Sequence, residues 1–127
     1  QIVICAITQK ILSIMTGKGK EHDFSLFRRS RLLINKKSKL LADSGYQGIA
    51  NYHENSDIPE KCSKNGVLSP ESKKNNRELS TKRILIENIN RQCKIFKIVK
   101  DVYRGKHKGY GLTWRIIGAL VNLRYQA

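Results

Sequence analysis

The sequence contains few cysteines and no metal-binding spacing of cysteine or histidine. It has three cysteines, which are Cys5, Cys62 and Cys93. The number is odd, and no two of them have CxxC spacing. Neither a disulfide framework nor a zinc finger is therefore supported. The three histidines lie far apart and form no HExxH or HxxxH motif: His22, His53 and His107. The pattern fits a protein of a reducing environment without a zinc site.

Long apolar runs are also absent. No stretch approaches the roughly 18 consecutive apolar residues that a membrane-spanning helix needs, and the sequence shows no secretory signal pattern. We therefore expect a cytoplasmic protein with no membrane partner. The chain begins at Gln1 directly with the strand-like "IVICAIT", and its single methionine is Met15. This start suggests that the natural reading frame or the domain begins further upstream.

Acidic residues are scarce relative to basic ones. The chain has 10 aspartates and glutamates and 25 lysines and arginines, which gives a formal net charge of +15 and a pI near 10.1. Such an imbalance indicates a polyanionic partner and says nothing about the fold. The 127 residues, of which 39% are hydrophobic, are enough for one ordinary domain with a core.

The hydrophobic pattern predicts an α/β domain. The β-branched residues 1–8 and 10–16 are expected to form two strands paired as a hairpin. Asp23 occupies an N-cap position before a helix over 24–34. Residues 40–42 predict a strand that ends at Asp43, and a further short strand is expected near Ile58.

Two helices are predicted in the second half of the chain. "SPE" at Ser69 has the N-cap, proline and acidic first turn of a helix start. Apolar residues then recur at helical steps and define one face of a long helix: Leu79, Ile86, Ile89, Cys93, Phe96, Val99 and Tyr103. The glycines of "YRGKHKGYG" end it. Residues 112–125 predict a terminal helix that is apolar on most sides and buried.

The stretch "LADSGYQGI" places one aspartate at the end of a strand. A carboxylate at that position can coordinate a divalent ion, or it can simply begin a turn. Gly45 and Gly48 would let the backbone approach DNA closely, and Tyr46 could stack there or pack.

The long helix carries a glutamate among basic residues. At roughly 100° per residue, Arg83, Glu87 and Lys94 fall on one stripe, together with Asn90 and Arg91. The structural interpretation is an i, i+4 ion pair between Arg83 and Glu87, worth a few tenths of a kcal/mol. The catalytic interpretation joins Glu87 to Asp43, because two magnesium ions need carboxylates from different elements.

Three segments in this order carry a family resemblance: "GKGKEHDFSLFRRS", "ADSGYQGI" and "LSTKRILIENINRQCKIFKI…YR". Together the segments resemble bacterial insertion-sequence transposases of the DDE class, in the branch with Arg, three residues, Glu, six residues, Lys. The resemblance implies a partial RNase H-like catalytic domain over 1–127, with Asp43 the second acidic ligand and Glu87 the third. Arg83 and Lys94 match the flanking basic positions, whereas Ser80 stands where the family often has tyrosine.

The resemblance also implies what lies outside this sequence. The family's first catalytic aspartate is expected on a strand upstream of Gln1, so this chain alone is expected to be inactive. Asp23, with His22 beside it, matches a recurrent family position near the site, although Asp23 could equally be a helix N-cap.

The implied function is DNA nicking and joining at transposon ends with two Mg²⁺ (or Mn²⁺) ions. The expected partner is DNA, both the transposon ends and the target, and the protein would be associated with the nucleoid when bound to it. The whole transposase could form a homo-oligomer. The residues expected to bind DNA are Lys18, Lys20, Arg83, Arg91, Lys94 and Arg104.

Two alternatives remain open. The first is a small basic nucleic-acid-binding protein without catalysis, in which Asp43 and Glu87 are structural. Its phosphate contacts would come from Lys18, Lys20, Arg28, Arg29, Arg91, Lys94 and Arg104. The second, a ribosome-associated protein, rests on charge alone.

Overall fold

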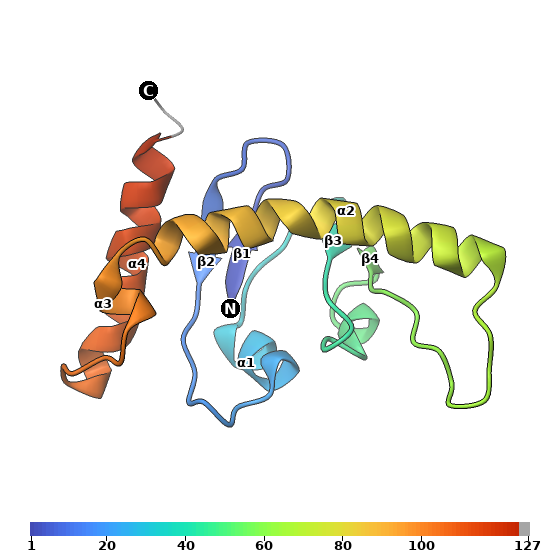
Figure 1. The fold of residues 1–127 in the computed structure, drawn as a ribbon, viewed down its shortest axis with the longest axis horizontal. Coiled ribbons are helices and arrows are strands. Elements are labelled where there is room, and N and C mark those ends of the chain that lie inside the picture. Colours follow the sequence, from blue (N-terminus) through green and yellow to red (C-terminus); the bar gives the residue numbers. More distant parts are fainter. Residues whose placement is uncertain (125–127) are drawn as a thin grey trace. The chain divides into compact units, whose positions relative to one another are not determined.

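A computed structural model describes residues 1–124 of the chain. These residues divide into two compact units (Figure 1): one comprises Gln1–Gly19 with Arg83–Ala127, described to residue 124, and the other comprises Lys20–Lys82. Helix α2 (Pro70–Cys93) contributes to both units. The helices and the two small sheets, each of two strands within the described residues, confirm a mixed α/β class.

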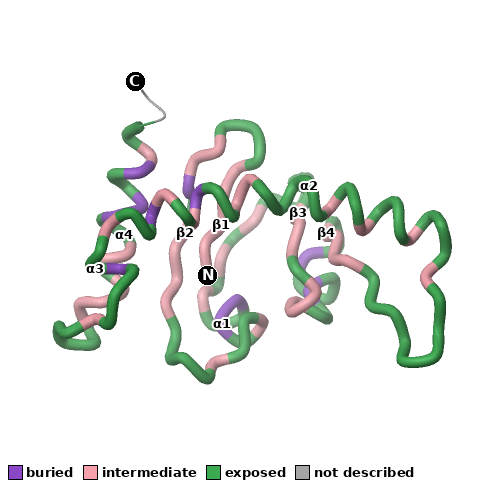
Figure 2. The backbone as a smooth tube through the Cα atoms, viewed as in Figure 1, coloured by how far each residue is buried: buried purple, intermediate pink, exposed green. Residues whose placement is uncertain are grey.

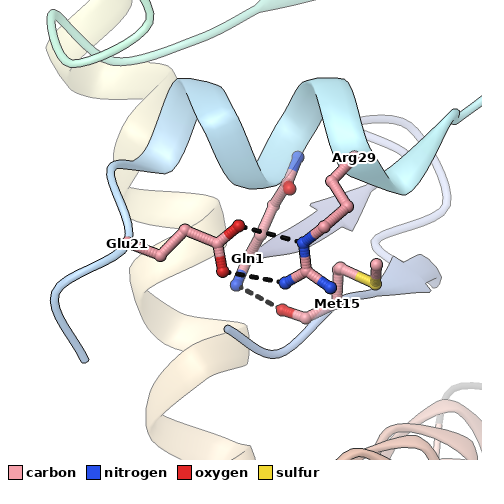
Figure 3. Close-up of polar contacts among 4 residues, drawn as sticks. All are labelled: Gln1, Met15, Glu21 and Arg29. Carbon is pink, nitrogen blue, oxygen red and sulfur yellow. Dashed lines mark hydrogen bonds and ion pairs between the residues drawn. The ribbon is translucent and has the colours of Figure 1, made fainter. Parts of the chain in front are cut away.

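The first unit begins with the expected hairpin. Strands β1 (Ile2–Ile4) and β2 (Ile11–Ile14) pair antiparallel, with Ile2 opposite Ile14. The Gln1 backbone nitrogen donates to the Met15 carbonyl over 2.8 Å and extends the pairing (Figure 3). The strands are shorter than the predicted ranges, because the connecting turn takes in residues from both. Gln9 lies in this turn with φ 56°, an uncommon conformation for a residue other than glycine.

The core of this unit forms between the hairpin, the end of α2, the short helix α3 (Lys97–Lys100) and helix α4 (His107–Arg124). Its buried residues are Ile11, Ile89, Cys93, Val99, Ile117 and Val121. Helix α4 approaches β2 closely at Gly118, where an added Cβ would lie 2.5 Å from Ile14 Cδ1. A larger residue at 118 would therefore displace the Ile14 side chain.

The long helix α2 starts where the sequence predicts and ends earlier. Ser69 Oγ accepts the Ser72 N–H over 3.1 Å at the N-terminal end, which confirms the start. The prediction that one helix continues toward Tyr103 is wrong. The chain tightens after Cys93, where the Phe96 N–H bonds the Cys93 carbonyl, three residues back. A separate short helix α3 (Lys97–Lys100) follows.

The apolar face predicted for one long helix, which the structure divides between α2, α3 and the residues around α3, is only partly buried. Ile89 and Cys93 of α2 and Val99 of α3 are buried, whereas the other members of the predicted face are half-buried: Leu79, Ile86, Phe96 and Tyr103. Most of the helix before residue 83 is exposed (Figure 2).

The terminal helix differs most from its prediction. It starts at His107 instead of 112, and Tyr125 lies outside the described residues. Only Ile117, Gly118 and Val121 are buried, so the expectation of a buried helix is wrong. Four apolar residues on α4 are between 42% and 58% exposed: Leu112, Ile116, Leu120 and Leu123. The physical reason is that a helix packed on one side buries only one face.

The second unit begins with helix α1 (Asp23–Ser30). Its N-cap is His22 and not Asp23, because the His22 Nδ1 accepts the Phe24 N–H over 3.4 Å. Asp23 is instead the first helical residue. The helix also ends before residue 34, since Arg31 adopts a left-handed conformation with φ 48°.

A parallel pair of short strands completes this unit. Strand β3 (Leu40–Leu41) pairs with β4 (Ser56–Asp57), just before Ile58. Between them lies the 3-10 helix η1 (Ile49–Asn51), of which Ile49 is buried. The expectation of a core strand over 40–42 holds only in part, because β3 is half-buried and two residues long.

Candidate catalytic site

Asp43 lies one residue beyond strand β3, at the strand end that the sequence predicts. The Ala42 N–H still bonds the Asp57 carbonyl, at 3.0 Å, so the parallel pairing continues to the residue before Asp43. A turn follows, closed by the Tyr46 N–H and the Asp43 carbonyl at 3.0 Å. The Ser44 N–H donates to Asp43 Oδ1 over 2.7 Å, and Asp43 is exposed. The strand end and the turn thus fix the backbone that carries the carboxylate.

Tyr46 connects this turn to helix α1. Its ring packs edge-on against Phe27, with ring centroids 6.3 Å apart, so of the two predicted roles packing is the one observed. Burial raises the pKa of Tyr46, and the negative charges of Asp23 and Asp43 raise this pKa further. Both carboxylates therefore act on the same phenol.

The two glycines of the turn have different local roles. A Cβ added at Gly45 would lie 3.6 Å from Asp23 Oδ2, so the first residue of α1 lies against the turn that follows Asp43. Gly48 has φ 88°, a conformation that L side chains rarely adopt, and it caps η1.

Glu87 lies on the exposed side of α2 and pairs with Arg83. The Arg83 Nε lies 3.1 Å from Glu87 Oε1, and the two side chains are 55% and 54% exposed. An exposed pair of this kind contributes at most about 1 kcal/mol. The predicted ion pair is therefore confirmed, and it leaves the catalytic interpretation of Glu87 open.

The predicted stripe beside Glu87 is present in part. Asn90 is half-buried and Arg91 exposed, both within α2. Lys94 follows the last residue of the helix, and its N–H still bonds the Asn90 carbonyl at 3.1 Å.

Asp43 and Glu87 belong to different units, since Asp43 lies within Lys20–Lys82 and Glu87 within Arg83–Ala127. Whether their carboxylates converge is a property of how the units are arranged, so that convergence stays a prediction. Over residues 1–124 no three His, Cys, Asp or Glu side chains gather as a metal-binding group. The donor chemistry of the two carboxylates nevertheless suits Mg²⁺, which prefers hard oxygen ligands.

The remaining predicted site residues occupy loops and helix ends. Lys18 and Lys20 are exposed between β2 and α1, and Arg104 is exposed between α3 and α4. Exposure makes these side chains accessible to a phosphate. His22, expected beside the site, caps α1.

Comparison with known proteins identifies the class. The DDE superfamily endonuclease family matches residues 1–122, and the chain belongs to this family. Among individual proteins, it is similar to the probable transposase for insertion sequence element IS702 of Microchaete diplosiphon, with 41% identity over 122 residues. The match covers 96% of this chain and 44% of that relative. No solved structure matches the chain. The predicted transposase resemblance is thus confirmed.

Within residues 1–124, no helix is both long enough and apolar enough to cross a membrane.

Proposed function

We propose that this chain forms part of the RNase H-like catalytic domain of an insertion-sequence transposase, which nicks and joins DNA at transposon ends. The family membership supports the enzyme class, and the similarity to a probable transposase supports transposition. The net charge of +15 supports a DNA partner.

The observation that carries the proposal is the position of Asp43. It is an exposed carboxylate one residue beyond a strand in a parallel pair, on a turn packed against α1. Ligands in sheet proteins commonly bind at the carboxyl ends of parallel strands. Asp23 acts on the same tyrosine as Asp43 and supplies a second negative charge close to this turn.

We assign Asp43 and Glu87 as the two carboxylates of this chain that hold Mg²⁺ or Mn²⁺. When bound, two such ions supply Lewis-acid stabilisation of the attacking and leaving oxygens of a phosphodiester. Arg83 pairs with the Glu87 side chain, and DNA or metal would compete for this exposed pair. Asp23 and His22 would act from the N-terminal end of α1 on the surroundings of Asp43, not as ligands.

The exposed cations would orient DNA by neutralising phosphates. In this proposal Lys18 and Lys20 contact the backbone from the loop before α1, and Arg104 does so from the loop before α4. Arg91 and Lys94 would contact it from the end of α2. Their contacts fix position and carry no sequence information.

The test measures Mn²⁺ binding to the 127-residue chain. Electron paramagnetic resonance reports the concentration of free ion during the titration. Asp43→Asn and Glu87→Gln should each weaken binding by about tenfold or more, as even the loss of an outer-shell partner costs about 10–100-fold. Glu78→Gln is the matched control, because it lies nine residues before Glu87 on the same helix and is exposed. At about 100° per residue that spacing places it on the opposite side.

Equal affinities for the Asp43→Asn, Glu87→Gln and Glu78→Gln variants would contradict the metal assignment. The non-catalytic DNA-binding protein would then be the better account, with the Arg83–Glu87 pair serving only α2. Asp101→Asn, an exposed aspartate after α3, checks that loss of any carboxylate does not produce the effect.

A further inference from the structure

A surface tyrosine holds an arginine in the second unit. Tyr52 follows η1 and is 56% exposed. The guanidinium carbon of Arg28 lies 5.6 Å from the centroid of its ring. Phe24, one turn earlier on α1, packs edge-on against the same ring at 5.5 Å and 77°. The tyrosine is therefore fixed against α1, and Arg28 rests on it.

Tyr52 also lines two hollows in the surface. One, of about 690 Å³, is lined by Ser25, Arg28, Arg29, Arg31 and Tyr52. The other, of about 600 Å³, is lined by Lys36 and residues 50–55. Because Tyr52 lines both, the hollows adjoin. Four cations and one acid, Glu54, contribute to them, so the surface attracts anions.

The three arginines of this surface are not equivalent. Arg29 donates from Nε and Nη2 to both carboxylate oxygens of Glu21, over 2.9 and 2.8 Å (Figure 3). Those bonds occupy the guanidinium N–H groups of Arg29 that could otherwise bind a phosphate. Arg31 is exposed, just past the end of α1. Arg28 and Arg31 are consequently the arginines we consider for an external ligand.

We propose that Arg28, held against the Tyr52 ring by this cation–π contact, binds a phosphate of the DNA backbone, with Arg31 and Lys36 contacting neighbouring phosphates. A guanidinium that rests on an aromatic ring in this way still has N–H groups available for two phosphate oxygens. The contact also restricts the Arg28 rotamers before binding, so less entropy is lost when the phosphate binds. The inference rests on the proposed function for the identity of the polyanion and adds a defined contact surface to it.

The first experiment asks whether the position of Arg28 matters for DNA binding beyond its positive charge. Fluorescence anisotropy would measure binding of the 127-residue chain to labelled duplex DNA of random sequence. Arg28→Ala should weaken binding about tenfold and lower the slope of log K against log salt by about 1. Lys73→Ala, an exposed lysine on α2, removes the same charge and should weaken binding less than about twofold. Equal losses for Arg28→Ala and Lys73→Ala would overturn the inference.

The second experiment tests the contact between Arg28 and Tyr52 separately from the charge of Arg28. Arg28→Lys keeps the charge at the end of α1 but loses the planar fork, and it should weaken binding nearly as much as Arg28→Ala. Tyr52→Ala should lose affinity, whereas Tyr52→Phe keeps the ring and should bind like the parent. Arg28→Ala combined with Tyr52→Ala should bind no more weakly than Arg28→Ala alone. Full affinity in Arg28→Lys or Tyr52→Ala would contradict a phosphate contact that depends on the Arg28–Tyr52 pair.

Two further readouts separate the possible failures. The circular dichroism spectrum of each variant should match that of the parent. If Arg28→Ala does not fold, Arg28→Lys still tests the role of the guanidinium. Anionic phosphatidylserine vesicles should bind the parent and Arg28→Ala equally. If Arg28→Ala weakened binding to the vesicles but not to DNA, the surface would be assigned to lipid headgroups instead. The Mn²⁺ titration of Asp43 and Glu87 uses no DNA, so the proposed function and this surface can fail independently.

Discussion

Asn122 forms two hydrogen bonds to the backbone of Ile11. The Asn122 Oδ1 accepts the Ile11 N–H over 2.7 Å, and the Asn122 Nδ2 donates to the Ile11 carbonyl over 2.9 Å. The amide thus satisfies both polar groups of a buried residue at the start of β2 from a helix 111 positions away. It performs the role that a neighbouring strand would have in a wider sheet.

Asn122→Ala should therefore destabilise the first unit by about 2 kcal/mol, because a buried donor and acceptor lose their partners. Asn122→Asp should cost at least as much, since its carboxylate can accept from the Ile11 N–H but opposes the Ile11 carbonyl. Urea denaturation followed by circular dichroism measures both. Asn88→Ala, at an exposed position of α2, is the control and should change the free energy of unfolding by under about 0.5 kcal/mol.

The burial of α2 can be tested with two isoleucines of the same helix. Ile89 is 1% exposed and Ile84 is 53% exposed. Ile89→Ala should cost about 3 kcal/mol, because it removes buried methyl groups and leaves a cavity. Ile84→Ala removes the same atoms from a largely exposed site and should cost under about 1 kcal/mol. Similar shifts in the denaturation midpoint would show that the helix presents a different face to the core.

The charges around Tyr46 predict a dependence on alkaline pH. Its pKa is raised in the folded chain by burial and then by Asp23 and Asp43. The stability that Tyr46 contributes is therefore complete below the ordinary tyrosine pKa of about 10. It is lost as the pH rises through the higher folded value, because the unfolded chain then ionises more readily.

Asp23→Asn and Asp43→Asn should each move the Tyr46 pKa back toward that ordinary value. Nuclear magnetic resonance of chain labelled at tyrosine would follow the titration, with Tyr46→Phe identifying the signal. Asp101→Asn, which removes an aspartate of the other unit, should leave this pKa unchanged. An unchanged titration in both Asp23→Asn and Asp43→Asn would show that neither carboxylate acts on Tyr46.

Local patterns in the sequence determined several elements. The β-branched run predicted the hairpin, and the Ser69 cap predicted the start of α2. Asp43 was expected at a strand end and lies there. These features depend on neighbouring residues, on propensity, spacing and capping, which are all readable along the chain. The segments with Asp43 and Glu87 also predicted the family.

Only the tertiary structure decided which faces are covered and which distant residues meet. The pattern of α4 is apolar on most sides, yet packing on a single side leaves Leu112 and Leu123 exposed. The Asn122 bonds to Ile11, the cation–π contact of Arg28 with Tyr52 and the shared action of Asp23 and Asp43 on Tyr46 join separate elements. No periodicity encodes such pairs, because they depend on how elements pack after each has formed.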